Sequence, residues 1–76
     1  MRSNSSEPKD LLTSVTLIIP AYNDEETVGR LIDDSDTLLS SVCSDYEIVV
    51  VNDGSKDRTL SVIEGRCQTN PHVRLI

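Results

Sequence analysis

The sequence predicts an α/β fold in which a parallel sheet is built in the order β-α-β-α-β. Two apolar, β-branched runs of strand length, residues 15–19 and 46–51, each stop at polar, turn-forming residues. Their apolar character is continuous, as expected of parallel strands whose sheet is covered by helices on both faces. After each run, apolar residues recur at three- and four-residue spacing, which indicates an amphipathic helix.

The first strand is predicted over residues 14–19, because Pro20 cannot donate to a strand ladder and marks the strand's end. Asn23 is predicted to be the N-cap of the following helix, with Glu26 completing a capping box. We expect this helix to end near Val42, with Asp33, Asp34 and Asp36 on its solvated side. Its predicted apolar face consists of Val28, Leu31, Ile32, Leu38, Leu39 and Val42.

The second half of the chain repeats this pattern. A strand over residues 46–51 ends at Asp53-Gly54, which is a turn signal. Ser55 is predicted to cap the second helix, and Asn70-Pro71 ends that helix. Residues 73–76 begin a third strand. The apolar stripe of the second helix consists of Leu60, Ile63 and Cys67.

The organisation of the chain suggests one partial domain. Residues 1–13 are polar and serine-rich, and we expect them to be a disordered lead-in. Residues 14–76 form the folded part. The first strand lacks the usual protection of an edge strand, and the third stops at Ile76 without a turn. We therefore expect the front part of a larger domain that is truncated at its C-terminus.

Composition restricts the partners. A net charge of −6 argues against a nucleic-acid surface, which needs clustered Lys and Arg. The sequence shows no secretory h-region and no apolar run near the ~20 residues of a membrane helix. Cys43 and Cys67 lack metal-ligand spacing, and we interpret them as reduced. The expected location is cytoplasmic, with membrane contact only through further segments.

Polar residues just past the strand ends are the candidate site, because ligands of open α/β sheets bind there. Asp53 has two interpretations: it caps the next helix, or it accepts from a base N–H or a ribose hydroxyl. Tyr22 either packs over the end of the sheet or stacks on a flat base. Both residues follow strands that we expect to be neighbours. No G-x-G-x-x-G or P-loop motif is present.

Residues 15–26 (VTLIIPAYNDEE) and 48–59 (IVVVNDGSKDRT) resemble the start of a family 2 glycosyltransferase with the GT-A fold. The resemblance implies a Rossmann-like front half that holds the nucleotide of a nucleotide-sugar donor. By position, Pro20, Ala21 and Tyr22 would line the base pocket. Asp24 stands where the family usually has a glutamate near the nucleotide, and Asp53 would contact the base or ribose.

The resemblance also implies an enzyme that is part of a longer chain. Such an enzyme transfers the sugar to an acceptor hydroxyl on a lipid phosphate, a saccharide or another molecule, and the full-length protein could act at the cytoplasmic face of a membrane. The complete domain is expected to use Mg²⁺ or Mn²⁺. Metal ligands and catalytic residues are expected beyond Ile76, so the 76 residues alone are expected to be inactive. The alternative is a non-catalytic nucleotide-binding module or a truncated remnant.

Overall fold

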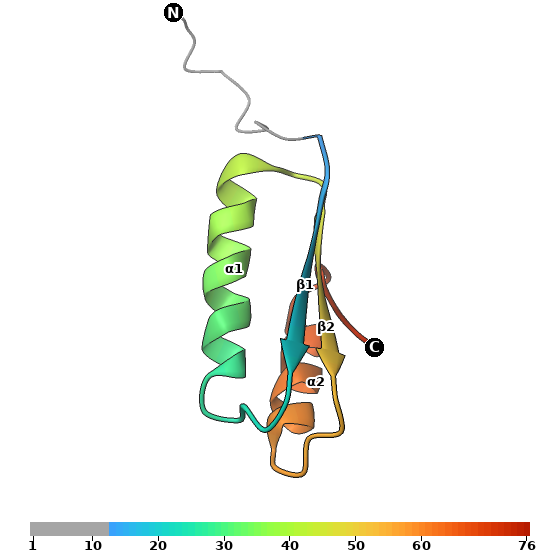
Figure 1. The fold of residues 1–76 in the computed structure, drawn as a ribbon. Coiled ribbons are helices and arrows are strands. Elements are labelled where there is room, and N and C mark those ends of the chain that lie inside the picture. Colours follow the sequence, from blue (N-terminus) through green and yellow to red (C-terminus); the bar gives the residue numbers. More distant parts are fainter. Residues whose placement is uncertain (1–12) are drawn as a thin grey trace, which may run out of the picture.

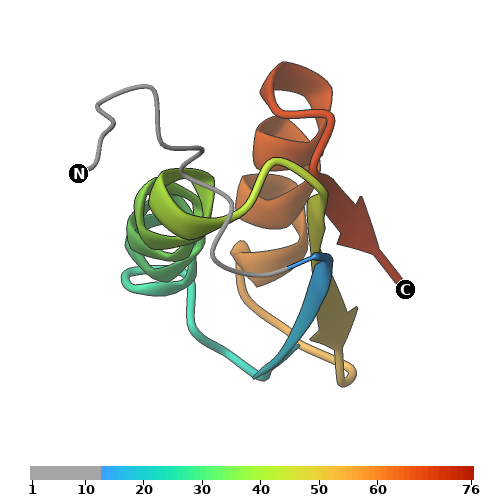
Figure 2. The same cartoon turned by 90° about the horizontal axis from the view of Figure 1, so that it is seen from above.

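The computed structural model describes residues 13–76, so the predicted lead-in lies outside the described residues except for Thr13. Three strands form one parallel sheet in the order β1-β2-β3 (Figures 1 and 2). This arrangement confirms the predicted Rossmann-like β-α-β-α-β order. The elements are β1 (Val15–Ala21), α1 (Val28–Val42), β2 (Tyr46–Asn52), α2 (Thr59–Thr69) and β3 (Val73–Leu75).

Both helices pack on the same face of the sheet (Figures 1 and 2). This face carries the alternate residues of β1 and β2 that become buried, among them Ala21, Ile48 and Val50. Ile32 of α1 and Ile63 of α2 are fully buried against them. Burying such side chains contributes about 1.5–3 kcal/mol each relative to leaving them exposed. One apolar core therefore holds the sheet to its helices.

The expectation of helices on both faces is wrong for residues 13–76. Ile18, on the other face of β1, is 63% exposed. Right-handed crossovers between strands that are adjacent in sequence order place successive helices on one side, which leaves the opposite face open. On that open face, Glu47 accepts hydrogen bonds from the Thr16 hydroxyl (3.1 Å) and from Arg74 Nη1 (3.0 Å). The bonds from Arg74 and Thr16 lower the pKa of Glu47.

The predicted end of the first strand and the apolar face of its helix also need correction. β1 continues through Pro20, which lies opposite Val51, to Ala21. Proline is tolerated because β1 is an edge strand of this sheet. In α1, Leu31 is 49% exposed and Leu38 is 65% exposed. A helix that covers one face of a three-stranded sheet buries only a narrow stripe of its surface.

Neither predicted N-cap is a cap. α1 begins at Val28, and the residue at its N-cap, Thr27, makes no side-chain capping bond. Asn23 instead has φ = 51°, a left-handed conformation that asparagine tolerates better than most residues. α2 begins at Thr59, with Arg58 at its N-cap, so Ser55 precedes the helix. Asn23 and Ser55 instead form hydrogen bonds between the two loops that follow β1 and β2.

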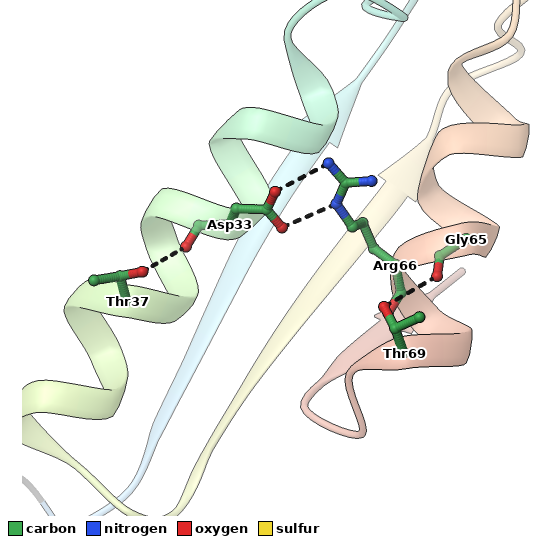
Figure 3. A network of polar contacts seen from close by, with 5 residues as sticks. All are labelled: Asp33, Thr37, Gly65, Arg66 and Thr69. Carbon is green, nitrogen blue, oxygen red and sulfur yellow. Dashed lines mark hydrogen bonds and ion pairs between the residues drawn. The ribbon is translucent and has the colours of Figure 1, made fainter.

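An ion pair joins the two helices across their exposed side. Asp33 of α1 accepts hydrogen bonds from Arg66 Nε (2.9 Å) and Nη2 (3.0 Å) of α2 (Figure 3). Gly29 lies beneath this pair. A Cβ atom at Gly29 would lie 2.7 Å from Arg66 Nη2 and 3.0 Å from Val62 Cγ1, so glycine permits the close approach of the helices.

At the amino ends of the strands, polar groups are paired with one another. The Tyr46 hydroxyl donates to Asp36 Oδ1 at 2.6 Å, and the Tyr46 ring stacks on His72 with centroids 3.9 Å apart. His72 Nδ1 lies 2.8 Å from the Tyr46 carbonyl oxygen, and Asn70 Oδ1 accepts the His72 backbone N–H. Burial, together with the hydrogen bond and the charge of Asp36, raises the pKa of Tyr46 to about 12. His72 therefore lies at the amino end of the sheet, immediately before β3.

Candidate functional site

Two loops meet at the carboxyl ends of β1 and β2: loop 22–27 after β1 and loop 53–58 after β2 (Figure 1). The strand register places them side by side, because Ala21 pairs with Asn52. The Asp53 backbone N–H extends this pairing by donating to the Ala21 carbonyl oxygen at 2.9 Å. The two strands therefore end at the same level, and Tyr22 and Asp53 follow them at adjacent positions of the sheet edge.

Tyr22 and Asp53 both present exposed side chains at this edge of the sheet. Tyr22 is 56% exposed, and Asp53 is also exposed. Within residues 13–76, no hydrogen bond engages the Tyr22 hydroxyl or the Asp53 carboxylate. Asp53 does not cap α2, because Asp57 Oδ1 accepts the Thr59 N–H at 2.9 Å. Of the two interpretations of Asp53, the geometry favours a carboxylate that is available to a ligand.

The carboxylate of Asp24 is directed toward its own loop. Its Oδ2 accepts the Tyr22 backbone N–H at 3.2 Å. The Asp24 carbonyl oxygen accepts the N–H groups of Thr27 (3.0 Å) and Val28 (2.8 Å), where α1 begins. Asp24 is half-buried and thus links the position of Tyr22 to the start of the helix.

Pro20 and Ala21 differ in what they present. Pro20 is exposed on the open face of the sheet, immediately before Tyr22. Ala21 is 1% exposed, and its methyl group belongs to the core. The structure thus brings together Pro20, Tyr22 and Asp53 as exposed groups, with Asp24 behind them, and leaves only the backbone of Ala21 near the site.

Alternate side chains of loop 53–58 and of Thr59, the first residue of α2, hold the backbone of loop 22–27. The backbone N–H groups of residues 23–25 donate in turn to Ser55 Oγ (2.9 Å), Thr59 Oγ1 (2.7 Å) and Asp57 Oδ2 (3.2 Å). The Thr59 hydroxyl itself donates to Asp57 Oδ1. This bond from Thr59 is the main cause that holds the pKa of Asp57 below its ordinary value.

The bonding between the loops is reciprocal. Asn23 Oδ1 accepts the Lys56 backbone N–H at 2.8 Å, and Glu25 Oε1 accepts that of Arg58 at 3.2 Å. We call these five inter-loop bonds the clasp. Sequence reasoning missed the roles of Asp57 and Thr59. The available signal was the alternation of short polar residues at 55, 57 and 59.

A hollow of about 350 Å³ lies beside loop 22–27, but it includes neither Tyr22 nor Asp53. It is lined by Asn23, Asp24, Glu25, Glu26, Thr27 and Asp57. Despite this acidity, no three His, Cys, Asp or Glu side chains within residues 13–76 are arranged to hold a metal ion. The described helices are also too short and too polar to span a bilayer. We call the exposed pair Tyr22 and Asp53, which lies outside this hollow, the shelf.

Comparison with known proteins identifies the family. The family model described as glycosyl transferase family 2 matches residues 16–76. A dolichyl-phosphate beta-glucosyltransferase from Trichomonas vaginalis is 32% identical over 91% of the chain, and the match covers 21% of that relative. A chondroitin synthase from Pasteurella multocida is 39% identical over 82% of the chain and is matched over 6% of its own length.

A third relative, an undecaprenyl-phosphate 4-deoxy-4-formamido-L-arabinose transferase from Pseudomonas fluorescens, is 36% identical over 66% of the chain. The chain spans about a fifth of the length of the dolichyl-phosphate enzyme and less of the other two. The family match includes both loops that carry the shelf, 22–27 and 53–58, and all residues of the clasp. The chain therefore belongs to glycosyl transferase family 2.

Proposed function

We propose that residues 14–76 are the nucleotide-binding part of a glycosyltransferase that moves a sugar from a nucleotide-sugar donor to an acceptor hydroxyl. The observation that carries this proposal is the pair formed by Tyr22 and Asp53. Both are exposed at the adjacent carboxyl ends of β1 and β2, with no hydrogen bond to either functional group within residues 13–76. Open α/β sheets bind their ligands at this edge.

In this proposal each residue has a distinct role. The Tyr22 ring stacks on the base, and the Asp53 carboxylate accepts from a base N–H or a ribose hydroxyl. Pro20 and the backbone of Ala21 border the base. Asp24 acts on the nucleotide through Tyr22, whose backbone N–H its carboxylate binds.

The chemical step belongs to other parts of the enzyme. The complete domain would use Mg²⁺ or Mn²⁺ at the donor diphosphate, with ligands from other parts of the enzyme. We accordingly expect no sugar transfer by the 76 residues alone. The relatives' names include a lipid phosphate and a polysaccharide, which supports an acceptor of either kind.

The proposed location is cytoplasmic, at the cytoplasmic face of a membrane where the acceptor is a lipid phosphate. The names of two relatives include dolichyl phosphate and undecaprenyl phosphate, which supports a lipid-phosphate acceptor in a membrane. Fractionation of cells that produce the protein tests the proposed location. Recovery of the protein outside the cytoplasmic compartment contradicts it.

Calorimetric titration of the chain with UDP, GDP, dTDP and CMP tests the nucleotide site. We expect one of these nucleotides to bind, and Asp53→Asn to weaken its binding by about tenfold or more, because the carboxylate's charge-assisted hydrogen bond is lost. Asp34→Asn is the matched control, since Asp34 is an exposed carboxylate on α1, away from the shelf. It should leave the affinity unchanged.

Two outcomes contradict the proposal. A chain that unfolds cooperatively in urea yet binds none of the nucleotides lacks the proposed site. A broad, non-cooperative transition favours the alternative of a truncated remnant. Sugar transfer catalysed by the 76 residues would contradict the separate claim that the chemical step lies elsewhere.

A further inference from the structure

The clasp fixes a loop that has no regular structure of its own. Residues 22–27 lie between the end of β1 and the start of α1, and the backbone N–H groups of residues 23–25 bind side chains rather than strand or helix carbonyls. Asn23 has φ = 51°, a conformation that needs support from its surroundings. Three successive N–H groups of this loop each bind a different side chain of the opposite segment. The position of Tyr22 at the head of the loop therefore depends on these bonds.

Thr59 is the central member of the clasp. It is 0% exposed, whereas the other two side chains that accept from loop 22–27, those of Ser55 and Asp57, belong to half-buried residues. Its hydroxyl accepts the Asp24 N–H at 2.7 Å and donates to Asp57 Oδ1. The other Asp57 oxygen accepts the Glu25 N–H. One hydroxyl thus fixes Asp24 directly and Glu25 through Asp57.

The link from Thr59 to the shelf is short. Asp24, whose N–H binds Thr59, uses its own carboxylate to hold the Tyr22 N–H at 3.2 Å. A residue with no exposed surface does not contact a ligand on the open shelf. Any effect of Thr59 on the ligand therefore acts through Asp24 and Tyr22.

We propose that Thr59 is a positioning residue of the nucleotide site: its buried hydroxyl holds Asp24 so that Tyr22 meets the base. This inference rests on the proposed function. It adds a specific determinant of affinity that lies outside the ligand-contacting residues. Without the hydroxyl, the hydrogen bond that holds Asp24 is lost. Part of the free energy of nucleotide binding must then offset the cost of ordering Tyr22, so the affinity falls.

The test compares Thr59→Val, which keeps the shape of the side chain and removes the hydroxyl, with Thr59→Ser, which keeps the hydroxyl. The affinity for the nucleotide that binds the unaltered chain is measured by calorimetry. We expect Thr59→Val to weaken binding about tenfold and Thr59→Ser to restore most of the affinity. Ile63→Val, a buried change on the same helix that removes one methyl group and no hydrogen bond of the clasp, should lower stability without changing the affinity.

A second readout needs no nucleotide. The pKa of the Asp57 carboxyl, followed by NMR, should rise toward its ordinary value in Thr59→Val and stay low in Thr59→Ser, because the Thr59 bond is the main cause of its depression. Amide exchange at Asp24 should also become faster in Thr59→Val. These measurements report whether the hydroxyl holds the loop.

The outcomes separate the two proposals. If the unaltered chain binds and Thr59→Val binds equally well, the positioning role is wrong while the nucleotide site stands. If Thr59→Val weakens binding only as much as Ile63→Val does, Thr59 acts through general stability and the inference is likewise overturned. If the unaltered chain is folded but binds no nucleotide, the proposed function fails, and this inference fails with it.

Discussion

The two tyrosines of this chain lie at opposite ends of the same sheet and are used in opposite ways. Tyr46, at the amino end, is 8% exposed, donates to Asp36 and stacks on His72. Tyr22, at the carboxyl end, is 56% exposed, and no hydrogen bond reaches its hydroxyl within residues 13–76. Pairing of buried polar groups stabilises a fold, whereas an exposed aromatic ring is available to a ligand. The pairing at the amino end serves stability, whereas recognition of a ligand at the carboxyl end is our proposal.

The carboxyl end itself contains both kinds of residue. Ser55, Asp57 and Thr59 are committed to loop 22–27 by hydrogen bonds. Asp53 lies only two residues before Ser55, yet its carboxylate has no hydrogen-bond partner within residues 13–76. The difference shows why acidity alone does not locate the site. What distinguishes Asp53 from Asp57 is the absence of an internal partner for its carboxylate.

The largest effect on stability is expected from Tyr46→Ala. Removing a buried aromatic side chain costs about 3–5 kcal/mol of the free energy of unfolding. Tyr46→Phe keeps the ring and loses only the bond to Asp36, for about 1.5 kcal/mol. Urea unfolding measures both changes. The nucleotide affinity of folded Tyr46→Phe should equal that of the unaltered chain, and a loss of affinity there would contradict the division between the two ends.

Tyr22→Ala should show the opposite behaviour. Loss of stacking on a base costs about 1–3 kcal/mol, which is roughly 5- to 150-fold in Kd. The free energy of unfolding should change by less than about 0.5 kcal/mol, because Tyr22 is exposed. Tyr22→Phe is the control, since it retains the stacking surface. Equal affinities for Tyr22→Ala and the unaltered chain would remove Tyr22 from the site.

High pH should weaken the amino end selectively. The pKa of Tyr46 is raised from 10.0 to about 12 in the folded state. Its contribution to stability is therefore complete below pH 10 and is lost as the pH rises from 10 to about 12. In Tyr22→Phe, Tyr46 is the sole remaining tyrosine, so tyrosinate absorbance should titrate with a midpoint near 12. A midpoint near 10 in a still-folded chain would contradict the burial of Tyr46 and its bond to Asp36.

The smallest effect is expected from Asp33→Asn, which breaks the ion pair with Arg66 (Figure 3). Both side chains are partly exposed, so the loss should be at most about 1 kcal/mol. The difference from the unaltered chain should shrink at 1 M salt, because salt screens exposed charges. Asp34→Asn controls for the change in net charge. A loss of unfolding free energy as large as that of Tyr46→Ala would contradict this and show that the ion pair stabilises the fold as much as a buried aromatic side chain does.

The sequence predicted the order of the elements because two continuous apolar runs and two amphipathic segments are local signals. It also predicted that Tyr22 and Asp53 would lie together, because parallel neighbours end at one edge. The caps at Asn23 and Ser55 were predicted wrongly, since their partners lie 32 or 33 residues away and a local capping pattern does not show such competition. Thr59 was missed for the same reason.

The expectation that helices cover both faces of the sheet was the other wrong prediction for residues 13–76. A continuous apolar strand such as β1 indicates that both faces can be covered, but it does not specify which segment covers each face. Ile18 therefore satisfied the pattern and is nevertheless exposed in residues 13–76. The assignment of Pro20, Ala21, Tyr22, Asp24 and Asp53 to a nucleotide remains a prediction that binding experiments must test.

Amide chemical-shift mapping of the ¹⁵N-labelled chain, titrated with UDP, GDP, dTDP and CMP, tests the central claim most directly. The account predicts that one nucleotide shifts the signals of Tyr22 and Asp53 and of the clasp residues behind them. The signals of Tyr46 and His72, at the other end of the sheet, should remain in place. Shifts confined to the amino end, or no shifts in a folded chain at millimolar nucleotide, would contradict it.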